Sequence, residues 1–235
     1  MNLSNKISKI YAKLLSQKNF IHTNIAQQDG QIVDIAIESY KTPTQRQKSI
    51  NDRILDEQFN FPLHNLYVHK TEQRILIVYR GTDVNDLQDI ISDIQIILGT
   101  NAIDVRIQQS LDFFDQVKVK YPEHQIRVTG HSLGGTIALI IAKHRLPERT
   151  ITFNPGSAPT KSFLAMMQDT LLKKERTTRI TTYKIFWDII STLSFIGNTK
   201  TFILETADPK KLHTINSFKE LFSCNPPSNT YTEKK

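Results

Sequence analysis

Cysteine and glycine are both scarce in this chain of 235 residues, which has one cysteine and eight glycines. Because a disulfide needs two cysteines, Cys224 cannot form one within the chain, so the fold does not depend on an oxidising compartment. Long apolar runs are also missing: the most apolar late stretch, residues 185–196, is interrupted by Asp188 and by hydroxyl residues. Lysines interrupt the first residues where a signal peptide would be continuously apolar, so we expect no secretion by that route.

Positive charge is in excess, with 30 lysines and arginines against 23 aspartates and glutamates, a formal net charge of +7. The basic residues are scattered, and no zinc-finger spacing or RNP-like aromatic motif accompanies them, so we expect no nucleic-acid partner. No metal-ligand cluster or phosphate-binding loop is evident, so we expect no cofactor and no metal. A solvated basic surface and peripheral contact with an anionic membrane surface both stay open, which leaves a cytoplasmic or a membrane-peripheral location.

The composition is that of a globular protein, with 39% hydrophobic and 23% charged residues. The length suits one domain better than two. We expect residues 1–223 to form this domain, with residues 1–60 as an N-terminal helical segment packed on the rest. The polar, proline-containing residues 224–235 are expected to be a flexible tail.

Strand-like and helix-like segments alternate from Leu66 onward. Residues 66–70 and 74–81 flank a polar turn and predict a hairpin. Residues 104–120 contain no glycine or proline and have apolar residues at helical spacing, which predicts a helix. The remaining segments are strand-like at 126–130, 150–156, 181–187 and 199–206, and helix-like at 133–146 and near 162–174. This alternation predicts an α/β fold with a central, mostly parallel sheet flanked by helices.

Three of the eight glycines surround Ser132 in the stretch VTGHSLGGTIA, residues 128–138. The pattern G-x-S-x-G lies here between a predicted strand and a predicted helix, which is the setting of a nucleophile elbow. In such an elbow the serine backbone is strained, and side chains at Gly130 and Gly134 would collide with the neighbouring strand and helix. The N–H of Leu133 would face charge that develops beside the serine oxygen. The alternative is a glycine-rich turn with an incidental serine.

Five motifs together resemble the class 3 lipase family of α/β-hydrolases over residues 66–218. They are YRGTD (79–83), VTGHSLGGTIA (128–138), FNPG (153–156), WDII (187–190) and HTINSF (213–218). The resemblance implies an α/β-hydrolase fold. It also implies that the backbone N–H of Thr82 is a second oxyanion donor, helped by its hydroxyl. Without the resemblance, the segment Arg80–Thr82 would simply be a turn at the end of a strand.

A serine hydroxyl needs a histidine to accept its proton and a carboxylate to orient that histidine. In α/β-hydrolases both follow the serine, the acid first. His213 is the one histidine at a suitable distance after Ser132, because the others precede the serine or lie in its turn or in the next helix. Asp188 follows a strand two strands on from the serine and is the preferred acid. Asp208 is the alternative and otherwise a turn former, while Asp169 falls in a helical segment.

The segment after Thr82 has the pattern of an amphipathic helix, because its apolar residues recur at intervals of three and four. In the resembling family this region is a lid that opens at a lipid surface. A helix packed permanently on the core fits the same pattern. The candidate lid residues are Leu87, Ile90, Ile91 and Ile94.

The motifs and the resemblance together predict a serine hydrolase that cleaves carboxylic esters of lipids, either acylglycerols or phospholipids. Ser132, His213 and Asp188 would be the triad, and Thr82 and Leu133 would hold the oxyanion. A short-chain esterase or a thioesterase could use the same triad. A noncatalytic lipid-binding protein on the same scaffold is the third alternative.

Overall fold

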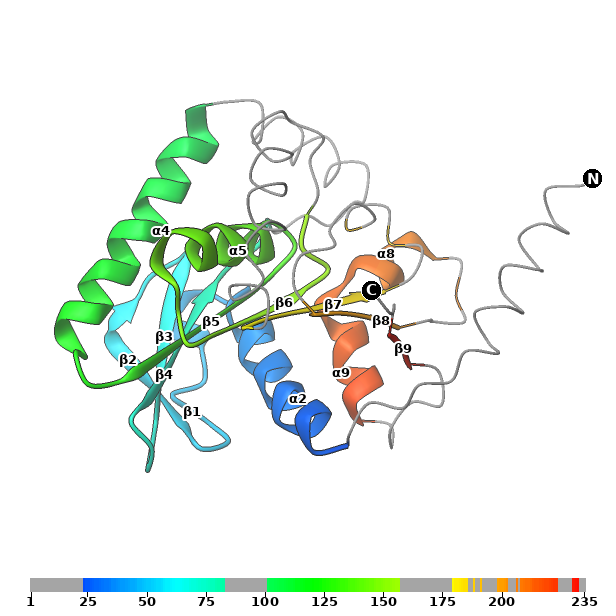
Figure 1. Cartoon of the computed structure of the whole chain (residues 1–235), viewed down its shortest axis with the longest axis horizontal. Helices are drawn as coiled ribbons and strands as arrows, with labels where there is room; N and C mark the ends of the chain where they lie inside the picture. Colours follow the sequence, from blue (N-terminus) through cyan, green and yellow to red (C-terminus); the bar gives the residue numbers. More distant parts are fainter. Residues whose placement is uncertain are drawn as a thin grey trace, which may run out of the picture.

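The computed structural model describes residues 23–82, 101–156, 179–185, 188, 191, 198–202, 206, 208–223 and 230–232. Within these residues nine strands form one sheet, and their order in the sheet is their order along the chain (Figure 1). The strands are β1 (Ser49–Ile50), β2 (Arg53–Asn60), β3 (His64–His69), β4 (Arg74–Tyr79), β5 (Gln125–His131), β6 (Arg149–Phe153), β7 (Ile180–Ile185), β8 (Asn198–Phe202) and β9 (Thr230–Thr232). The helices are α2 (Thr23–Glu38), the 3₁₀ turn η1 (Pro43–Gln45), α4 (Asn101–Lys120), α5 (Leu133–Arg145), α8 (Pro209–His213) and α9 (Ile215–Ser223).

The five central strands, β4 to β8, run parallel, and the pairs at both edges are antiparallel. A short turn joins β3 to β4, which confirms the predicted hairpin. Parallel neighbours need a crossover connection, and α4 and α5 lie in the connections from β4 to β5 and from β5 to β6. The carboxyl ends of β4, β5, β6 and β7 therefore meet at one edge of the sheet, where ligand sites of such sheets lie.

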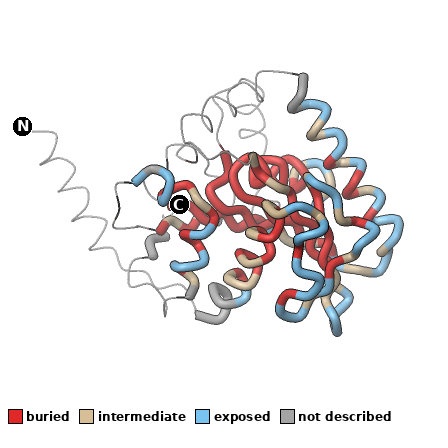
Figure 2. Tube along the Cα trace, turned by 180° about the vertical axis from the view of Figure 1, so that it is seen from behind, coloured by how far each residue is buried: buried red, intermediate tan, exposed pale blue. Residues whose placement is uncertain are grey.

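Helices cover both faces of the sheet. Figure 1 shows α2 and α9 side by side on one face and α4 with α5 on the other. Alternate residues of each strand enter the two cores, as Val78 joins the core beside α2 and α9 while Tyr79 joins the core beside α4 and α5. Figure 2 shows the buried residues concentrated in the middle of the molecule. Residues 133–142 of α5 are all among the buried ones.

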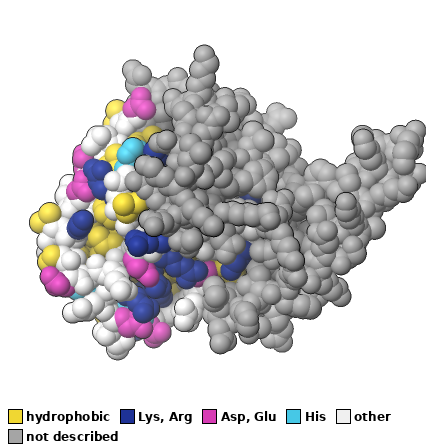
Figure 3. Space-filling model, in the orientation of Figure 1, with side chains coloured by type: hydrophobic (Ala, Val, Ile, Leu, Met, Phe, Trp, Pro, Cys, Tyr) yellow, Lys and Arg dark blue, Asp and Glu magenta, His cyan; other side chains and the backbone are white. Residues whose placement is uncertain are grey.

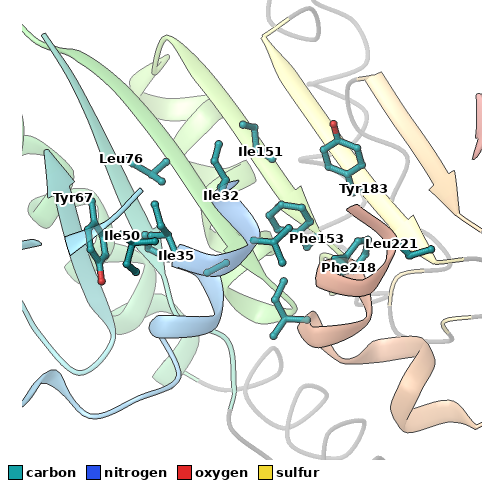
Figure 4. Packing of buried hydrophobic residues seen from close by; sticks show 14 of the residues in the cluster. Ile32, Ile35, Ile50, Tyr67, Leu76, Ile151, Phe153, Tyr183, Phe218 and Leu221 are labelled. Carbon is teal, nitrogen blue, oxygen red and sulfur yellow. The ribbon is translucent and has the colours of Figure 1, made fainter. Parts of the chain in front are cut away.

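Aromatic residues in the core beside α9 hold this helix against the central strands. Phe153 of β6 stacks on Tyr183 of β7 at 5.6 Å between ring centroids, and Phe218 of α9 lies 5.2 Å from Phe153 (Figure 4). Aromatic pairs at these distances contribute about 0.5–1.5 kcal/mol beyond the burial of their surface. Because α8 directly precedes α9, this packing also sets the position of α8 over the edge of the sheet.

At both ends of the chain, the structure has strands in segments that were expected to be helical or a flexible tail. The predicted helical segment 1–60 contains α2, but residues 49–60 form β1 and β2. Leu55 and Phe59 are four residues apart, the spacing of residues on one face of a helix. In the structure they enter opposite cores, because a bulge between Leu55 and Asn60 shifts the register of the strand. The expected flexible tail contains β9, which pairs with β8 and covers the backbone groups at that edge.

Candidate active site

Ser132 lies in a sharp bend between the carboxyl end of β5 and the first turn of α5. Its backbone has φ 56° and ψ −127°, a conformation that costs an L-residue on the order of 1–3 kcal/mol. A Cβ on Gly130 would lie 2.3 Å from the carbonyl carbon and oxygen of Gly134, and a Cβ on Gly134 would lie 2.0 Å from the carbonyl oxygen of Tyr79. Both positions therefore require glycine, for the steric reason that the sequence suggested.

The hydroxyl of Ser132 faces the imidazole of His213, which is the last residue of α8. The distance from Oγ to Nε2 is 2.9 Å, within hydrogen-bond range. The two residues are 81 positions apart in the chain and only 2% and 3% exposed. A buried serine and an imidazole in direct contact form the pair that nucleophilic catalysis requires.

The other ring nitrogen of His213 faces Asp188, which follows β7. Nδ1 of His213 lies 3.1 Å from both carboxylate oxygens, and Asp188 is 3% exposed. The structure thus brings Asp188, and not Asp208, to His213. Asp208 instead caps the N-terminus of α8, where its side chain accepts a hydrogen bond from the backbone N–H of Lys210. Asp169 lies outside the described residues.

The two predicted oxyanion donors lie beside the serine bend. Leu133 is the first residue of α5, so its N–H has no acceptor within the helix, and the residue is fully buried. Thr82 follows Gly81 at the end of β4, and a Cβ on Gly81 would lie 3.3 Å from the Cβ of Ser132. In the described part of the chain, the buried Oγ1 of Thr82 has no hydrogen-bond partner. A buried hydroxyl that lacks a partner can donate a hydrogen bond to an oxygen atom that enters the site.

Asn154, which the sequence analysis did not single out, joins the elements that carry the acid and the base. Its Nδ2 donates to the carbonyl of Leu212 at 2.8 Å, and its Oδ1 accepts from the backbone N–H of Ile185 at 2.8 Å. Asn154 has φ 40°, which this residue type tolerates better than most. The amide thereby fixes α8 against the end of β7. Its place in the FNPG motif was the one signal that could have identified it.

His131 and Tyr40 also reach the site, although the sequence analysis treated His131 only as part of the turn. Nε2 of His131 lies 2.6 Å from the main-chain carbonyl oxygen of His213, and its Nδ1 lies 2.6 Å from the hydroxyl of Tyr40. Burial, followed by the proximity of His213, lowers the pKa of His131 to about 3. The imidazole of His131 is therefore neutral at physiological pH.

The candidate lid residues Leu87, Ile90, Ile91 and Ile94 lie outside the described residues. Among the residues that are described, no three His, Cys, Asp or Glu side chains are grouped so that they could hold a metal ion. Nor does any helix in the described ranges combine the length and the apolar character needed to cross a membrane.

The sequence matches a family model along most of its length. The model is described as phospholipase-like, a Tle-like phospholipase domain, and it matches residues 18–218. No curated protein matches the chain.

Solved structures of fungal lipases are similar to this one in fold. Lip2 lipase of Yarrowia lipolytica is 21% identical with a TM-score of 0.53, and the match covers 75% of this chain and 78% of that one. A triacylglycerol lipase of Penicillium expansum is 12% identical with a TM-score of 0.51, covering 79% and 82%. At these identities the similarity concerns the fold alone, and it confirms the predicted α/β-hydrolase fold.

Proposed function

Because this chain belongs to the phospholipase-like family that has a Tle-like phospholipase domain, we propose that it is a serine hydrolase that cleaves carboxylic ester bonds of lipids. The observation that carries the proposal is the continuous series of contacts from Ser132 through His213 to Asp188. Such a series supplies a nucleophile, a base and a group that orients the base. All three are buried, which strengthens the electrostatic interactions between them.

In the first half of the proposed reaction, the hydroxyl of Ser132 attacks the ester carbonyl carbon while Nε2 of His213 accepts its proton. Asp188 accepts the hydrogen bond from Nδ1–H and stabilises the imidazolium that results. The backbone N–H groups of Thr82 and Leu133, with the hydroxyl of Thr82, hold the oxyanion. Each such donor typically contributes on the order of a hundredfold or more in rate.

The tetrahedral intermediate then collapses. His213 gives its proton to the departing alcohol, which leaves the acyl group on Ser132 as an ester. A water molecule next loses a proton to His213 and attacks this acyl group through a second oxyanion. The carboxylic acid leaves, and Ser132 regains its proton from the imidazolium.

The proposed substrate is a phospholipid in an aggregated surface, because the matching family is named for phospholipases. The net charge of +7 would attract the protein to anionic lipid surfaces. Figure 3 shows basic side chains gathered on the described part of one face, with acidic side chains next to them. Contact with an anionic membrane surface is therefore part of the proposal.

A labelling experiment with a fluorophosphonate tests the proposed nucleophile, since this probe phosphonylates only an activated serine. We expect the wild-type protein to be labelled and Ser132→Ala to be silent. Ser110→Ala is a matched control, because the Oγ of Ser110 also lies 2.9 Å from a histidine Nε2, that of His64. Labelling that persists in Ser132→Ala would refute the assignment of the nucleophile.

The substrate is tested by release of fatty acid from vesicles of phosphatidylglycerol or phosphatidylcholine, beside emulsified triacylglycerol and soluble short-chain esters and thioesters. Faster release from the phospholipid vesicles supports the proposal, and Ser132→Ala should abolish it. A preference for soluble short-chain esters or thioesters would favour a different hydrolase. Lipid binding without either labelling or hydrolysis would favour a noncatalytic protein.

A further inference from the structure

The side chain of His131 lies between two fixed polar groups. Its Nε2 faces the main-chain carbonyl of His213 at 2.6 Å, and its Nδ1 faces the hydroxyl of Tyr40 at 2.6 Å. His131 is buried. Tyr40 follows the end of α2, His131 is the last residue of β5 and His213 is the last residue of α8, so the three residues come from distant parts of the chain. The proposed mechanism assigns no role to either His131 or Tyr40.

The chemistry of the carbonyl group determines where the protons lie. A carbonyl oxygen only accepts hydrogen bonds, so Nε2 of His131 must carry the hydrogen. In a neutral ring the other nitrogen, Nδ1, then has a lone pair, and the hydroxyl of Tyr40 must donate to it. The low pKa of His131, caused first by burial and then by His213, agrees with a neutral ring.

A neutral ring matters because His213 becomes positively charged in the proposed reaction. The ring centroids of His131 and His213 are 4.9 Å apart, so a charge on His131 would oppose the developing imidazolium. The carboxylate of Asp188 contacts Nδ1 of His213. The guanidinium of Arg80 lies over the ring of Tyr40, 5.7 Å from its centroid, and Arg106 also interacts electrostatically with Tyr40.

Tyr40 also contacts the segment that carries a proposed oxyanion donor. A Cβ on Gly81 would lie 2.3 Å from the hydroxyl oxygen of Tyr40 and 2.6 Å from the carbonyl oxygen of His131. The hydroxyl therefore lies against the peptide that leads to Thr82. The side chain of Tyr40 therefore lies against both His131, which contacts His213, and the peptide that leads to Thr82.

We propose that Tyr40 and His131 are positioning residues for the hydrolysis: the hydroxyl of Tyr40 fixes the neutral, Nε2-protonated form of His131, which holds His213 by its main-chain carbonyl. This inference rests on the proposed function, since it gives these residues a role in the same reaction. His131 acts through His213, and Tyr40 acts through His131. Neither one touches the reacting atoms.

The first test removes one hydroxyl. In Tyr40→Phe we expect kcat on a soluble ester to fall about tenfold, as for the loss of one hydrogen bond, with KM within about twofold. Tyr67→Phe is the matched control, because it removes a different hydrogen-bonded tyrosine hydroxyl, one that donates to the main-chain carbonyl of Gln47 at 3.0 Å. Circular dichroism and thermal unfolding establish that both variants fold. Equal kcat in Tyr40→Phe and Tyr67→Phe would overturn the proposal.

The pH dependence distinguishes a positioning role from a structural one. Without the donor at Nδ1, His131 can bind a proton there at a higher pH than in the wild type, so the activity deficit of Tyr40→Phe relative to the wild type should grow as the pH falls. A deficit of the same size at every pH would contradict the role of Tyr40 in keeping His131 neutral.

Substitution at His131 tests its hydrogen bond to the carbonyl of His213 apart from its hydrogen bond to Tyr40. The amide nitrogen of glutamine can reach the place of Nε2 and donate to the carbonyl of His213, whereas leucine cannot. We therefore expect His131→Gln to retain about tenfold more of the wild-type kcat than His131→Leu. Equal activity of these two variants would contradict the proposed hold on His213.

Nuclear magnetic resonance tests the inference without any turnover. In protein with ¹⁵N-labelled histidine, we expect His131 to be in the neutral Nε2–H form from pH 7 to about pH 5, and Nδ1 of His131 to bind a proton at a higher pH in Tyr40→Phe than in the wild type. An Nδ1–H form, or titration of His131 in the wild type within that range, would overturn the inference. A wild-type protein that neither reacts with fluorophosphonate nor hydrolyses esters would instead refute the proposed function, and the spectrum would still decide the state of His131.

Discussion

Gly134 lies so close to the end of β4 that a Cβ on it would be 2.0 Å from the carbonyl oxygen of Tyr79 and 2.7 Å from the carbonyl carbon of Arg80. Backbone thus packs directly on backbone between the serine bend and the strand that leads to Thr82. A main-chain carbonyl cannot move aside as the end of a flexible side chain can. The positions of the proposed nucleophile and of one oxyanion donor are therefore coupled through this contact.

Replacement of Gly134 by alanine should consequently destabilise the protein by about 3 kcal/mol or more, at the upper end of the cost of overpacking. Gly135→Ala is the matched control, since its Cβ would meet its nearest neighbours at 3.1 Å, where small shifts suffice. Urea unfolding of both variants measures the difference. Equal destabilisation by the two substitutions would show that the contact at Tyr79 is not rigid.

The two aspartates near His213 should behave in opposite ways. Asp188→Ala removes the group that is proposed to orient the base, so we expect kcat to fall about 10³–10⁴-fold with little change in KM. Asp208→Ala removes only the cap of α8 and should lower the free energy of unfolding by about 1 kcal/mol while kcat stays within about threefold. A large loss of kcat in Asp208→Ala, with activity kept in Asp188→Ala, would reverse the assignment of the acid.

The hydroxyl of Thr82 should contribute to the rate beyond the backbone N–H of the same residue. Its buried Oγ1 has no partner within the described residues, so it can donate to the oxyanion. Thr82→Val keeps the shape but loses the donor, and we expect kcat to fall on the order of a hundredfold, whereas Thr82→Ser should stay within about threefold of the wild type. Wild-type kcat in Thr82→Val would mean that the backbone donors suffice.

The fold should lose stability in mild acid because of His64. Burial, together with the positive charges of Arg106 and Arg46, lowers its pKa from 6.5 to about 4. The unfolded chain binds a proton near pH 6.5 and the folded chain does not, so this contribution is complete above pH 6.5 and is lost as the pH falls to about 4. The loss amounts to about 3 kcal/mol.

Urea unfolding at pH 7.5, 5.5 and 4.5 measures this dependence. His64→Gln should be less stable than the wild type at pH 7.5, because a hydrogen bond to Ser110 and a stack on Phe113 are changed. Its stability should nevertheless fall less steeply with pH. The same slope in both proteins would show that other groups cause the acid sensitivity.

The sequence predicted those parts of the fold that depend on local pattern. The hairpin of β3 and β4 and the helix α4 are confirmed, because strand and helix periodicities are regular there. The serine bend has a positive φ, in agreement with the strained backbone that G-x-S-x-G predicted. The convergence of Ser132, His213 and Asp188 followed from the order of the parallel strands, and the structure places these side chains in contact. Their roles are the subject of the experiments above.

Other contacts between distant segments could not be predicted. The helix-like spacing of the apolar residues in β2 is explained by a bulge, and this bulge depends on the pairing of β2 with β3. The strand β9 depends on an open edge at β8 and not on its own polar sequence. Tyr40 and His131 are 91 residues apart, so no local pattern could indicate that one fixes the tautomer of the other.

The strand order of the sheet has a consequence for how the protein is made. Since each strand pairs with the one that precedes it in the chain, no later strand has to insert between two that are already joined. The sheet can therefore grow from β1 outward while the ribosome adds residues, and the elbow can form as soon as β4, β5 and α5 have emerged. His213 comes 81 residues after Ser132, so a nascent chain carries its strained serine without the imidazole that contacts it until α8 has docked.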